Sequence, residues 1–207
     1  MKRTVVFGAI LSAGLAIPAI AALQEGTKAP DFSAQASMGG KEFSFSLAEA
    51  LKKGPVVLYF YPAAFTKGCT IEAPDFADAM PQYAALGATV IGVSHDTIDT
   101  LDRFSVSECR SKFPVAADPQ QTVMKSYGAV LASHPQYANR TSYVIAPDHS
   151  ILMTYTDISS DKHVELTLAA VKKWHDAQGS GQAAKSPRIS SSPPRRASSA
   201  SRYPQSP

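Results

Sequence analysis

A cysteine at the junction of a predicted strand and a predicted helix is the feature that points to chemistry. Residues 56–61, Val-Val-Leu-Tyr-Phe-Tyr, are apolar, β-branched or aromatic, which predicts a buried strand. Pro62 ends that strand because it has no backbone N–H, and Cys69 follows after a short loop. Unpaired N–H groups and the positive end of a helix dipole favour a thiolate there. Thr66 lies three residues earlier, within reach of the sulfur or of its target, so the stretch predicts nucleophilic sulfur chemistry.

The residues around this cysteine resemble the signature of one family. Pro62, Thr66 and Cys69 form the pattern Pro-x-x-x-Thr-x-x-Cys, which is similar to that of the peroxiredoxins, the thiol peroxidases. Thr70 and Glu72 extend it to a Cys-Thr-x-Glu form that looks like the bacterioferritin-comigratory or peroxiredoxin Q branch. The resemblance implies that Cys69 attacks the peroxide, that Thr66 exchanges a proton with it and that Pro62 shapes the pocket. The simpler roles are an inert buried thiol, a helix N-cap and a strand stop.

Peroxide reduction also needs a cation that holds the thiolate charged and donates to the departing oxygen. Arg140 is the candidate, because it leads a predicted strand and its Arg-x-x-Tyr-Val-Ile sequence resembles the pattern that supplies the family's catalytic arginine. A guanidinium suits this role, since its planar fork stays charged and donates to two partners. Glu72 could orient Arg140 without touching the substrate. A surface arginine and a solvated helix glutamate are the alternatives.

Cys109 is the second of two cysteines and the candidate resolving residue, which would form a disulfide with oxidised Cys69. In the common form of the resembled branch the resolving cysteine stands five residues after the first, where this chain has Pro74. A variant of the branch places it in the following helical region, comparable to the position of Cys109. A spectator thiol and a structural disulfide are the alternatives, and a permanent disulfide would consume the nucleophile.

Charge and motifs exclude several other classes of function. The five histidines show no metal-ligand spacing, and the chain has no Cys-x-x-Cys, Gly-x-Gly-x-x-Gly or phosphate loop. The net charge of +3 becomes −4 without the two ends, which hold seven basic residues and no acid. We therefore expect no metal, no cofactor and no nucleic-acid partner. The expected partners are a peroxide substrate and a thioredoxin-like or other thiol reductant, with the protein a monomer or weak homodimer.

The two ends differ in character from the middle. Two basic residues precede an apolar stretch at 5–20, and Ala19-Ile20-Ala21 forms an Ala-x-Ala cleavage site at its end. Residues 1–21 are therefore predicted to be a secretory signal peptide. We expect an exported, periplasmic protein with no membrane span after cleavage; an uncleaved anchor is the alternative. Of the 29 residues at 179–207, 16 are Gly, Ser or Pro, which predicts a disordered tail. Its basic residues would allow a tether to an anionic surface, but a non-essential tail is the preferred interpretation.

The pattern between the ends alternates strands with helices. The predicted strands lie around Phe43 and Phe45 and at 56–61, 89–94, 113–117, 141–145 and 151–155, and the predicted helices at 46–54, from 69 to about 87 (kinked or in two pieces at Pro74 and Pro81), 97–109, 121–127 and 161–177. This order predicts an α/β domain over residues 22–178 with a three-layer, thioredoxin-like fold, a mixed central sheet with helices on both faces. The resemblance, over roughly residues 24–175, implies the same fold.

Three functions are compatible with these observations. The leading one is an exported thiol peroxidase that reduces hydrogen peroxide or small organic hydroperoxides through a cysteine sulfenic acid. The second is a thioredoxin-like thiol–disulfide oxidoreductase, which the missing Cys-x-x-Cys opposes. The third is a redox-sensing binding domain on the same fold. Peroxide consumption by the purified protein with a thiol reductant separates them.

Overall fold

The computed structural model describes the backbone of residues 21–185 and the side chains of residues 21–179. Residues 1–20 of the predicted signal peptide and residues 186–207 of the predicted tail lie outside the described residues. The elements are, in chain order, β1 (Ser33–Met38), β2 (Lys41–Ser46), α1 (Leu47–Leu51), β3 (Val56–Phe60), α2 (Lys67–Ala85), β4 (Thr89–Ser94), α3 (Ile98–Ser107), β5 (Val115–Ala117), α4 (Thr122–Ser126), β6 (Thr141–Ile145), β7 (Ile151–Thr156) and α5 (His163–Lys185).

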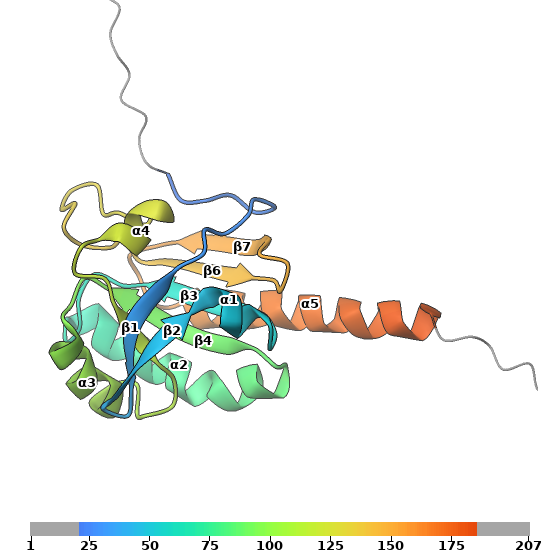
Figure 1. Ribbon diagram of the computed structural model, residues 1–207, viewed down its shortest axis with the longest axis horizontal. Helices are drawn as coiled ribbons and strands as arrows, with labels where there is room; N and C mark the ends of the chain where they lie inside the picture. The colour runs from blue at the N-terminus through green and yellow to red at the C-terminus, as the bar shows by residue number, and fades with distance from the viewer. Residues whose placement is uncertain (1–20, 186–207) are drawn as a thin grey trace, which may run out of the picture.

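A single mixed sheet forms the middle layer, with the strand order β2-β1-β5-β4-β3-β6-β7 (Figure 1). The central strands β5, β4 and β3 are parallel, whereas β6 pairs antiparallel with both β3 and β7. The β1–β2 hairpin is antiparallel and joins the sheet through β5. Parallel strands need helical crossovers, which is why helices α2 and α3 alternate with β3, β4 and β5. The predicted mixed sheet is confirmed.

Strand β3 shows how the sequence builds a core on each side of this sheet. Every residue of β3 is buried, because side chains that alternate between the two faces both meet covering layers. Val56, Leu58 and Phe60 pack into one hydrophobic cluster, and Val57 and Tyr59 pack into the other. The continuous apolar run therefore belongs to a strand covered on both faces, as predicted.

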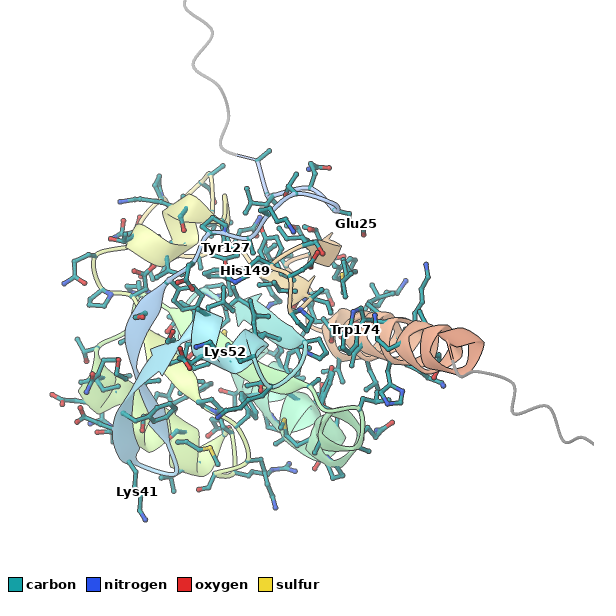
Figure 2. The ribbon with its side chains drawn as sticks, turned by 45° about the vertical axis from the view of Figure 1, so that its right-hand side comes forward. Glu25, Lys41, Lys52, Tyr127, His149 and Trp174 are labelled. Atoms are coloured by element: carbon teal, nitrogen blue, oxygen red, sulfur yellow. The ribbon has the colours of Figure 1, made fainter. Side chains whose placement is uncertain are left out.

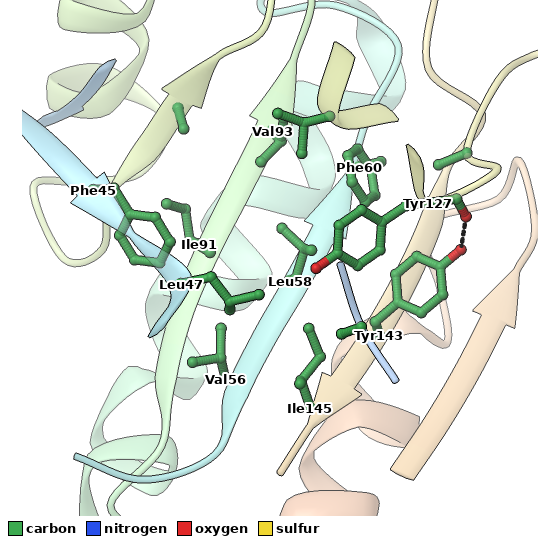
Figure 3. Packing of buried hydrophobic residues seen from close by; sticks show 14 of the residues in the cluster. Phe45, Leu47, Val56, Leu58, Phe60, Ile91, Val93, Tyr127, Tyr143 and Ile145 are labelled. Carbon is green, nitrogen blue, oxygen red and sulfur yellow. Dashed lines mark hydrogen bonds between the residues drawn. The ribbon is translucent and has the colours of Figure 1, made fainter. Parts of the chain in front are cut away.

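The first cluster lies under the short helices α1 and α4. It brings together Leu47 of α1, Met124 of α4 and the inward side chains of β3, β4 and β6 (Figure 3). Aromatic rings close this core, and the Tyr143 hydroxyl donates to the Tyr127 carbonyl over 2.6 Å (Figure 3). A buried phenol needs such a partner, so this hydrogen bond keeps the cluster free of an unpaired polar group.

The second cluster lies under α2, α3 and α5 on the opposite face and contains both cysteines. Phe76 of α2 stacks on Tyr59 with ring centroids 4.4 Å apart, and Phe104 of α3 stacks on Tyr61 at 5.6 Å. Helices on both faces of the sheet complete the predicted thioredoxin-like layers. This second face is the one that carries the chemistry.

Helix α2 was predicted to be kinked or in two pieces, and the two-piece form is wrong. It runs without interruption from Lys67 to Ala85, with Pro74 and Pro81 inside it. Each proline removes one intrahelical hydrogen bond. Buried side chains such as Phe76 and Tyr83, which anchor the helix to the sheet and to α5, provide the compensating contacts.

Strand β1 was not predicted, and β2 forms the predicted edge. The turn between them contains Gly39 and Gly40, both at positive φ, where glycine is the favoured residue. Lys41 begins β2 and points outward from the molecule (Figure 2). A charged edge of this kind discourages pairing with a further strand.

The last helix, α5, begins at His163 and continues to Lys185, past the boundary predicted at Gly179, so residues 179–185 are helical rather than disordered. Its C-terminal part extends beyond the sheet (Figure 1). Trp174, labelled in Figure 2, is half-buried and lines a surface hollow together with Leu152 of β7. Within the described residues, no helix is both long and apolar enough to cross a bilayer.

Candidate active site

The loop between β3 and α2 is fixed by the end of the neighbouring strand β4. The Asp96 carboxylate accepts a 2.7 Å hydrogen bond from the backbone N–H of Ala64 and another of 2.7 Å from the Ser94 hydroxyl. His95 Nδ1 lies 3.0 Å from the carbonyl oxygen of Pro62, which is half-buried after the strand. These contacts hold a loop that has no regular structure, so the start of α2 has a defined place.

Thr66 stands at the N-cap of α2, which was the simpler role left open for it, but its hydroxyl does not cap the helix. It donates instead to the Ala63 carbonyl over 2.9 Å, which helps the preceding Phe65 to adopt a positive φ of 61°. The Thr66 side chain is exposed. A hydroxyl that has donated its hydrogen keeps its lone pairs, so Thr66 can accept a hydrogen bond from a ligand in front of the helix.

Cys69 lies in the first turn of α2 and is buried. Its sulfur is 3.5 Å from Nη2 of Arg140, which comes from the residue before β6. Gly68 makes this approach possible, because a Cβ added there would lie 2.7 Å from the same Nη2 atom. Sequence reasoning missed Gly68, although a glycine beside the reactive cysteine is visible in the motif.

Arg140 is buried and each arm of its guanidinium has a partner. Nη2 faces the Cys69 sulfur, Nη1 donates to Oε2 of Glu72, and Nε donates to the Ile158 carbonyl over 3.0 Å. The predicted grouping of Cys69, Glu72 and Arg140 is therefore present, and the alternative of a solvated Glu72 is wrong. An arginine held at three points presents its charge to the sulfur in one orientation.

The electrostatics of this group follow from its burial. Burial raises the pKa of Glu72 to about 8, although the Arg140 guanidinium beside it acts in the opposite direction and Asp75 adds to the rise. Burial alone would lower the pKa of Arg140, but Glu72 and Cys69 outweigh it and the pKa lies above its ordinary value. The site thus holds one permanent cation, Arg140. The Glu72 carboxyl or the Cys69 thiol can balance its positive charge by losing a proton.

His163 and Ser142 lie behind Glu72, and sequence reasoning missed both. His163 is buried at the start of α5, with Nδ1 2.8 Å from the Ser142 hydroxyl and 4.0 Å from Oε1 of Glu72. Burial lowers its pKa below the ordinary value, and Arg140 acts in the same direction. The only sequence signal was a histidine in place of an apolar residue on the buried face of a helix.

Cys109 follows α3 and is as buried as Cys69. Both thiols are free, and both belong to the cluster around Tyr59 and Tyr61. Burial raises the pKa of the Cys109 thiol, and the neighbouring Glu108 adds to the rise. The helix predicted to reach Cys109 ends at Ser107, so Cys109 lies in the turn beyond it.

A metal site near Cys69 has no support from the described residues. Their one group of potential ligand atoms lying within 4.8 Å of one another is Glu42, Asp99 and Asp102, on β2 and α3. Two of these three acids are exposed, and none of the three is a member of the group formed by Cys69, Glu72 and Arg140.

Comparison with known proteins identifies the class that this fold and thiol site define. The model of the AhpC/TSA family matches residues 26–153, and the chain belongs to this family, the peroxiredoxins. It is 30% identical to the chloroplastic peroxiredoxin Q of Suaeda salsa over 72% of this chain and 68% of the relative. It is 27% identical to peroxiredoxin Bcp of Xanthomonas campestris over 56% of this chain and 76% of that relative.

A solved structure supports membership of the same family. The crystal structure of peroxidoxin BcpB from Mycobacterium tuberculosis matches with a TM-score of 0.66 and 31% identity, over 73% of this chain and 97% of that one. These similarities support the bacterioferritin-comigratory and peroxiredoxin Q branch that the Cys-Thr-x-Glu motif indicated. The protein is a peroxiredoxin, and thiol peroxidase activity follows for it as a member of the family.

Proposed function

We propose that Cys69 is the nucleophile of this thiol peroxidase and that Arg140 and Thr66 hold the peroxide in line with it. The observation that carries the proposal is the 3.5 Å contact between Arg140 Nη2 and the Cys69 sulfur in the first turn of α2. The thiolate attacks one peroxide oxygen, so an S–O bond forms as the O–O bond breaks. The departing oxygen keeps the electron pair and takes up a proton to give water or an alcohol, and Cys69 becomes a sulfenic acid.

The other site residues support this reaction. Arg140 would donate to the oxygen that gains negative charge, as oxyanion donors do in other enzymes. Thr66 would accept a hydrogen bond from the peroxide O–H with its free lone pairs, since its own hydrogen is directed to Ala63. Pro62 would shape the pocket at the end of β3. Glu72 orients Arg140 from the far side and does not touch the substrate.

Hydrogen peroxide and small organic hydroperoxides are the substrates we propose. Phe65, Ile71 and Ile158 are exposed apolar side chains on the segments that surround the site. Such side chains would favour an alkyl group beside the peroxide over bulk water. Ile158→Ser should therefore reduce kcat/KM for an alkyl hydroperoxide more than for hydrogen peroxide; an equal loss for both would argue against an apolar rim.

Peroxide consumption tests the activity directly. The purified protein should oxidise a thiol reductant at the expense of hydrogen peroxide, with one equivalent of peroxide consumed per disulfide formed. Disulfide exchange without peroxide consumption would indicate the oxidoreductase alternative instead. No turnover of either kind would indicate a redox-sensing domain.

Resolution by Cys109 is the second part of the proposal. The Cys109 thiol would attack the sulfenic acid, so that an S–S bond forms and the sulfenic oxygen leaves as water with the Cys109 proton. Both residues are buried against Tyr59 and Tyr61, so the first turn of α2 has to unwind locally for the sulfurs to meet. Pro74 supports this step, because it removes a hydrogen bond that would otherwise hold that turn.

Mass spectrometry after one equivalent of peroxide tests the resolving step. The wild type should lose two protons and give a peptide linked through Cys69 and Cys109. Cys109→Ser should stop at the sulfenic acid and proceed to sulfinic acid in excess peroxide. Oxidation of Cys69 alone in the wild type would instead make this a one-cysteine enzyme. A thioredoxin-like dithiol is the reductant that we propose for the disulfide.

Export to the periplasm is also part of the proposal. The predicted cleavage after Ala21 would fall two residues before Leu23, the backbone of which accepts a 2.7 Å hydrogen bond from the Thr154 hydroxyl. Leu23, close to the expected start of the mature chain, therefore already takes part in the fold. N-terminal sequencing of protein from a periplasmic fraction should start at Ala22; protein that starts at Met1 in the cytoplasmic fraction would argue against export.

A further inference from the structure

One oxygen of the Glu72 carboxyl has no hydrogen-bond partner among the described residues, although it is fully buried. Oε2 accepts from Arg140, whereas Oε1 is unpaired and lies 4.0 Å from Nδ1 of His163. An unpaired carboxylate oxygen away from water is strongly unfavourable. A proton on Oε1 would remove this cost by turning an acceptor into a donor.

The hydrogen bonds of His163 fix which of its nitrogens faces Glu72 with a lone pair. Nε2 lies 3.0 Å from the Asp157 carbonyl, which can only accept, so Nε2 carries the hydrogen. In the neutral imidazole Nδ1 is then an acceptor, and it takes the hydrogen of the Ser142 hydroxyl over 2.8 Å. Two acceptors, Nδ1 and Oε1, therefore point at each other across 4.0 Å with no hydrogen between them.

We propose that Glu72 and His163 form a proton-holding pair, in which His163 is a positioning residue that stabilises a protonated Glu72 and thereby the thiolate of Cys69. The proposal rests on the assignment of Cys69 as the nucleophile. Glu72 holds its proton at Oε1, on the side of the Nδ1 lone pair of His163, both before and after Cys69 ionises. The proton that Cys69 loses leaves to solvent, so the charge of Arg140 is then balanced by the thiolate alone.

Charge balance explains why a protonated Glu72 is favourable. Arg140 is one buried cation, and two ionised neighbours, Cys69 and Glu72, would leave the buried site with an excess negative charge. A protonated Glu72 restores a one-to-one balance while Cys69 is a thiolate.

The groups that face this pair from neighbouring elements act in both directions, and burial is the largest cause of the net shift at each residue. Asp75 on α2 raises the pKa of Glu72, and Arg140 lowers that of His163. Asp157 raises the pKa of His163 through its carbonyl and its charge, but burial outweighs this effect and the net pKa is lowered. The Tyr155 ring packs edge-on against the imidazole at 4.8 Å and carries no charge. Glu72 thus favours its protonated form, and His163 its neutral form.

Infrared difference spectroscopy tests the proposal on the unmodified protein. The spectrum of the reduced protein is recorded across the pH range in which the S–H band of Cys69 is lost, with no peroxide present. A carbonyl band of a buried protonated carboxylic acid should be present while Cys69 is a thiolate, and this band should be missing in Glu72→Gln. A spectrum of the thiolate form without that band would overturn the proposal.

Variants give an independent measurement through the pH midpoint of thiolate absorbance. Glu72→Gln imitates the protonated carboxyl permanently, so its midpoint should stay close to that of the wild type. His163→Gln keeps a donor for Asp157 but removes the acceptor Nδ1, so the midpoint should rise by about one pH unit, a tenfold loss of thiolate at a given pH. His163→Asn keeps a polar group at the Nδ1 position and should lie between His163→Gln and wild type. His175→Gln, an exposed histidine on the same helix, is the matched control.

A double-mutant cycle separates positioning from general structural damage. In the Glu72→Gln background, His163→Gln should no longer shift the midpoint, because the proton that it stabilises is absent. The same shift in both backgrounds, or a rise in the midpoint in Glu72→Gln alone, would overturn the proposal. These titrations need no peroxide, so lack of peroxidase activity in the wild type would count against the proposed function and leave this result independent.

Discussion

The two cysteines have almost the same packing and very different electrostatic surroundings. Cys69 and Cys109 are both fully buried and free, and both contact the aromatic cluster that contains Tyr59 and Tyr61. Cys69 has Arg140 at 3.5 Å and lies in the first turn of a helix. Cys109 lies past the end of a helix, next to Glu108, and its pKa is raised.

This difference shows that burial alone does not decide whether a thiol is reactive. Removal from water disfavours the thiolate at both positions, and only Cys69 has a cation and helix N–H groups that offset it. The same desolvation then strengthens the attraction between Cys69 and Arg140. Cys109 therefore suits the second step, in which it loses its proton only as the disulfide forms.

Exchange of each thiol for a hydroxyl is the most severe test of this contrast. Cys69→Ser should abolish peroxide turnover with an unchanged fold, because serine is nearly isosteric and a far weaker nucleophile at neutral pH. Cys109→Ser should still form the sulfenic acid in a single turnover. Stopped-flow peroxide consumption with circular dichroism as the fold control measures both; substantial turnover by Cys69→Ser would reverse the assignment.

Replacing the cation tests whether its shape matters as well as its charge. Arg140→Lys keeps a positive charge but cannot donate to Glu72, Cys69 and Ile158 together, so the peroxide rate should fall about 10²- to 10³-fold. The second-order rate constant for the first oxidation is the measurement. Arg103→Lys, at an exposed position, is the control. A near-normal rate in Arg140→Lys would mean that another cation activates the thiol.

A single methyl group can move that cation. In Gly68→Ala the new Cβ would lie 2.7 Å from Nη2 of Arg140, and the side chain must shift away from Cys69. We expect a roughly tenfold to hundredfold loss of rate with little loss of stability, because the clash is with the end of a flexible side chain. Gly179→Ala, at a helical glycine with open space around it, should leave the rate unchanged. Equal rates in both variants would show that the Arg140 contact is dispensable.

The smallest expected effect concerns stability against pH. Glu72 has a pKa of about 8 in the folded protein and an ordinary value near 4.5 when unfolded, so the folded state binds more protons between these limits. Its stabilisation is present in full below pH 4.5 and is lost as pH rises to about 8, with a slope of at most about 1.4 kcal/mol per pH unit. Glu72→Gln should flatten this slope in urea unfolding, whereas Glu165→Gln, exposed on α5, should not; parallel curves would contradict the buried protonated carboxyl.

The sequence predicted the parts of the molecule that local patterns encode. The apolar run 56–61, the cysteine at a helix start and the arginine before a strand all have signals within a few residues of themselves. The pairing of Glu72 with Arg140 followed from the resemblance and from the chemical need for an oriented cation. These elements include most of the sheet and all three members of the Cys69 group.

What the sequence did not reveal depends on contacts between distant segments. Strand β1, Ser-Ala-Gln-Ala-Ser-Met, has few residues that favour strands, and it forms because β2 and β5 pair with it. Helix α2 stays continuous through Pro74 because its packed face outweighs the lost hydrogen bond. His163 and Ser142 belong to the site only because the fold places them behind Glu72, which lies far from both in the chain. Composition alone predicts that the tail starts at Gly179, but composition does not report on how far a helix propagates.

The order of the chain also sets the order in which the site can be made. Cys69 and Glu72 leave the ribosome well before Arg140, which lies 71 and 68 positions later. Until β6 is available to pair with β3, docking of α2 would bury a carboxyl and a thiol with no cation between them, which is unfavourable. We therefore expect helix α2 to complete its docking only once β6 is available to pair with β3. A chain that still lacks β6 lacks the cation beside Cys69, so we expect the thiol to become reactive only when the domain is complete.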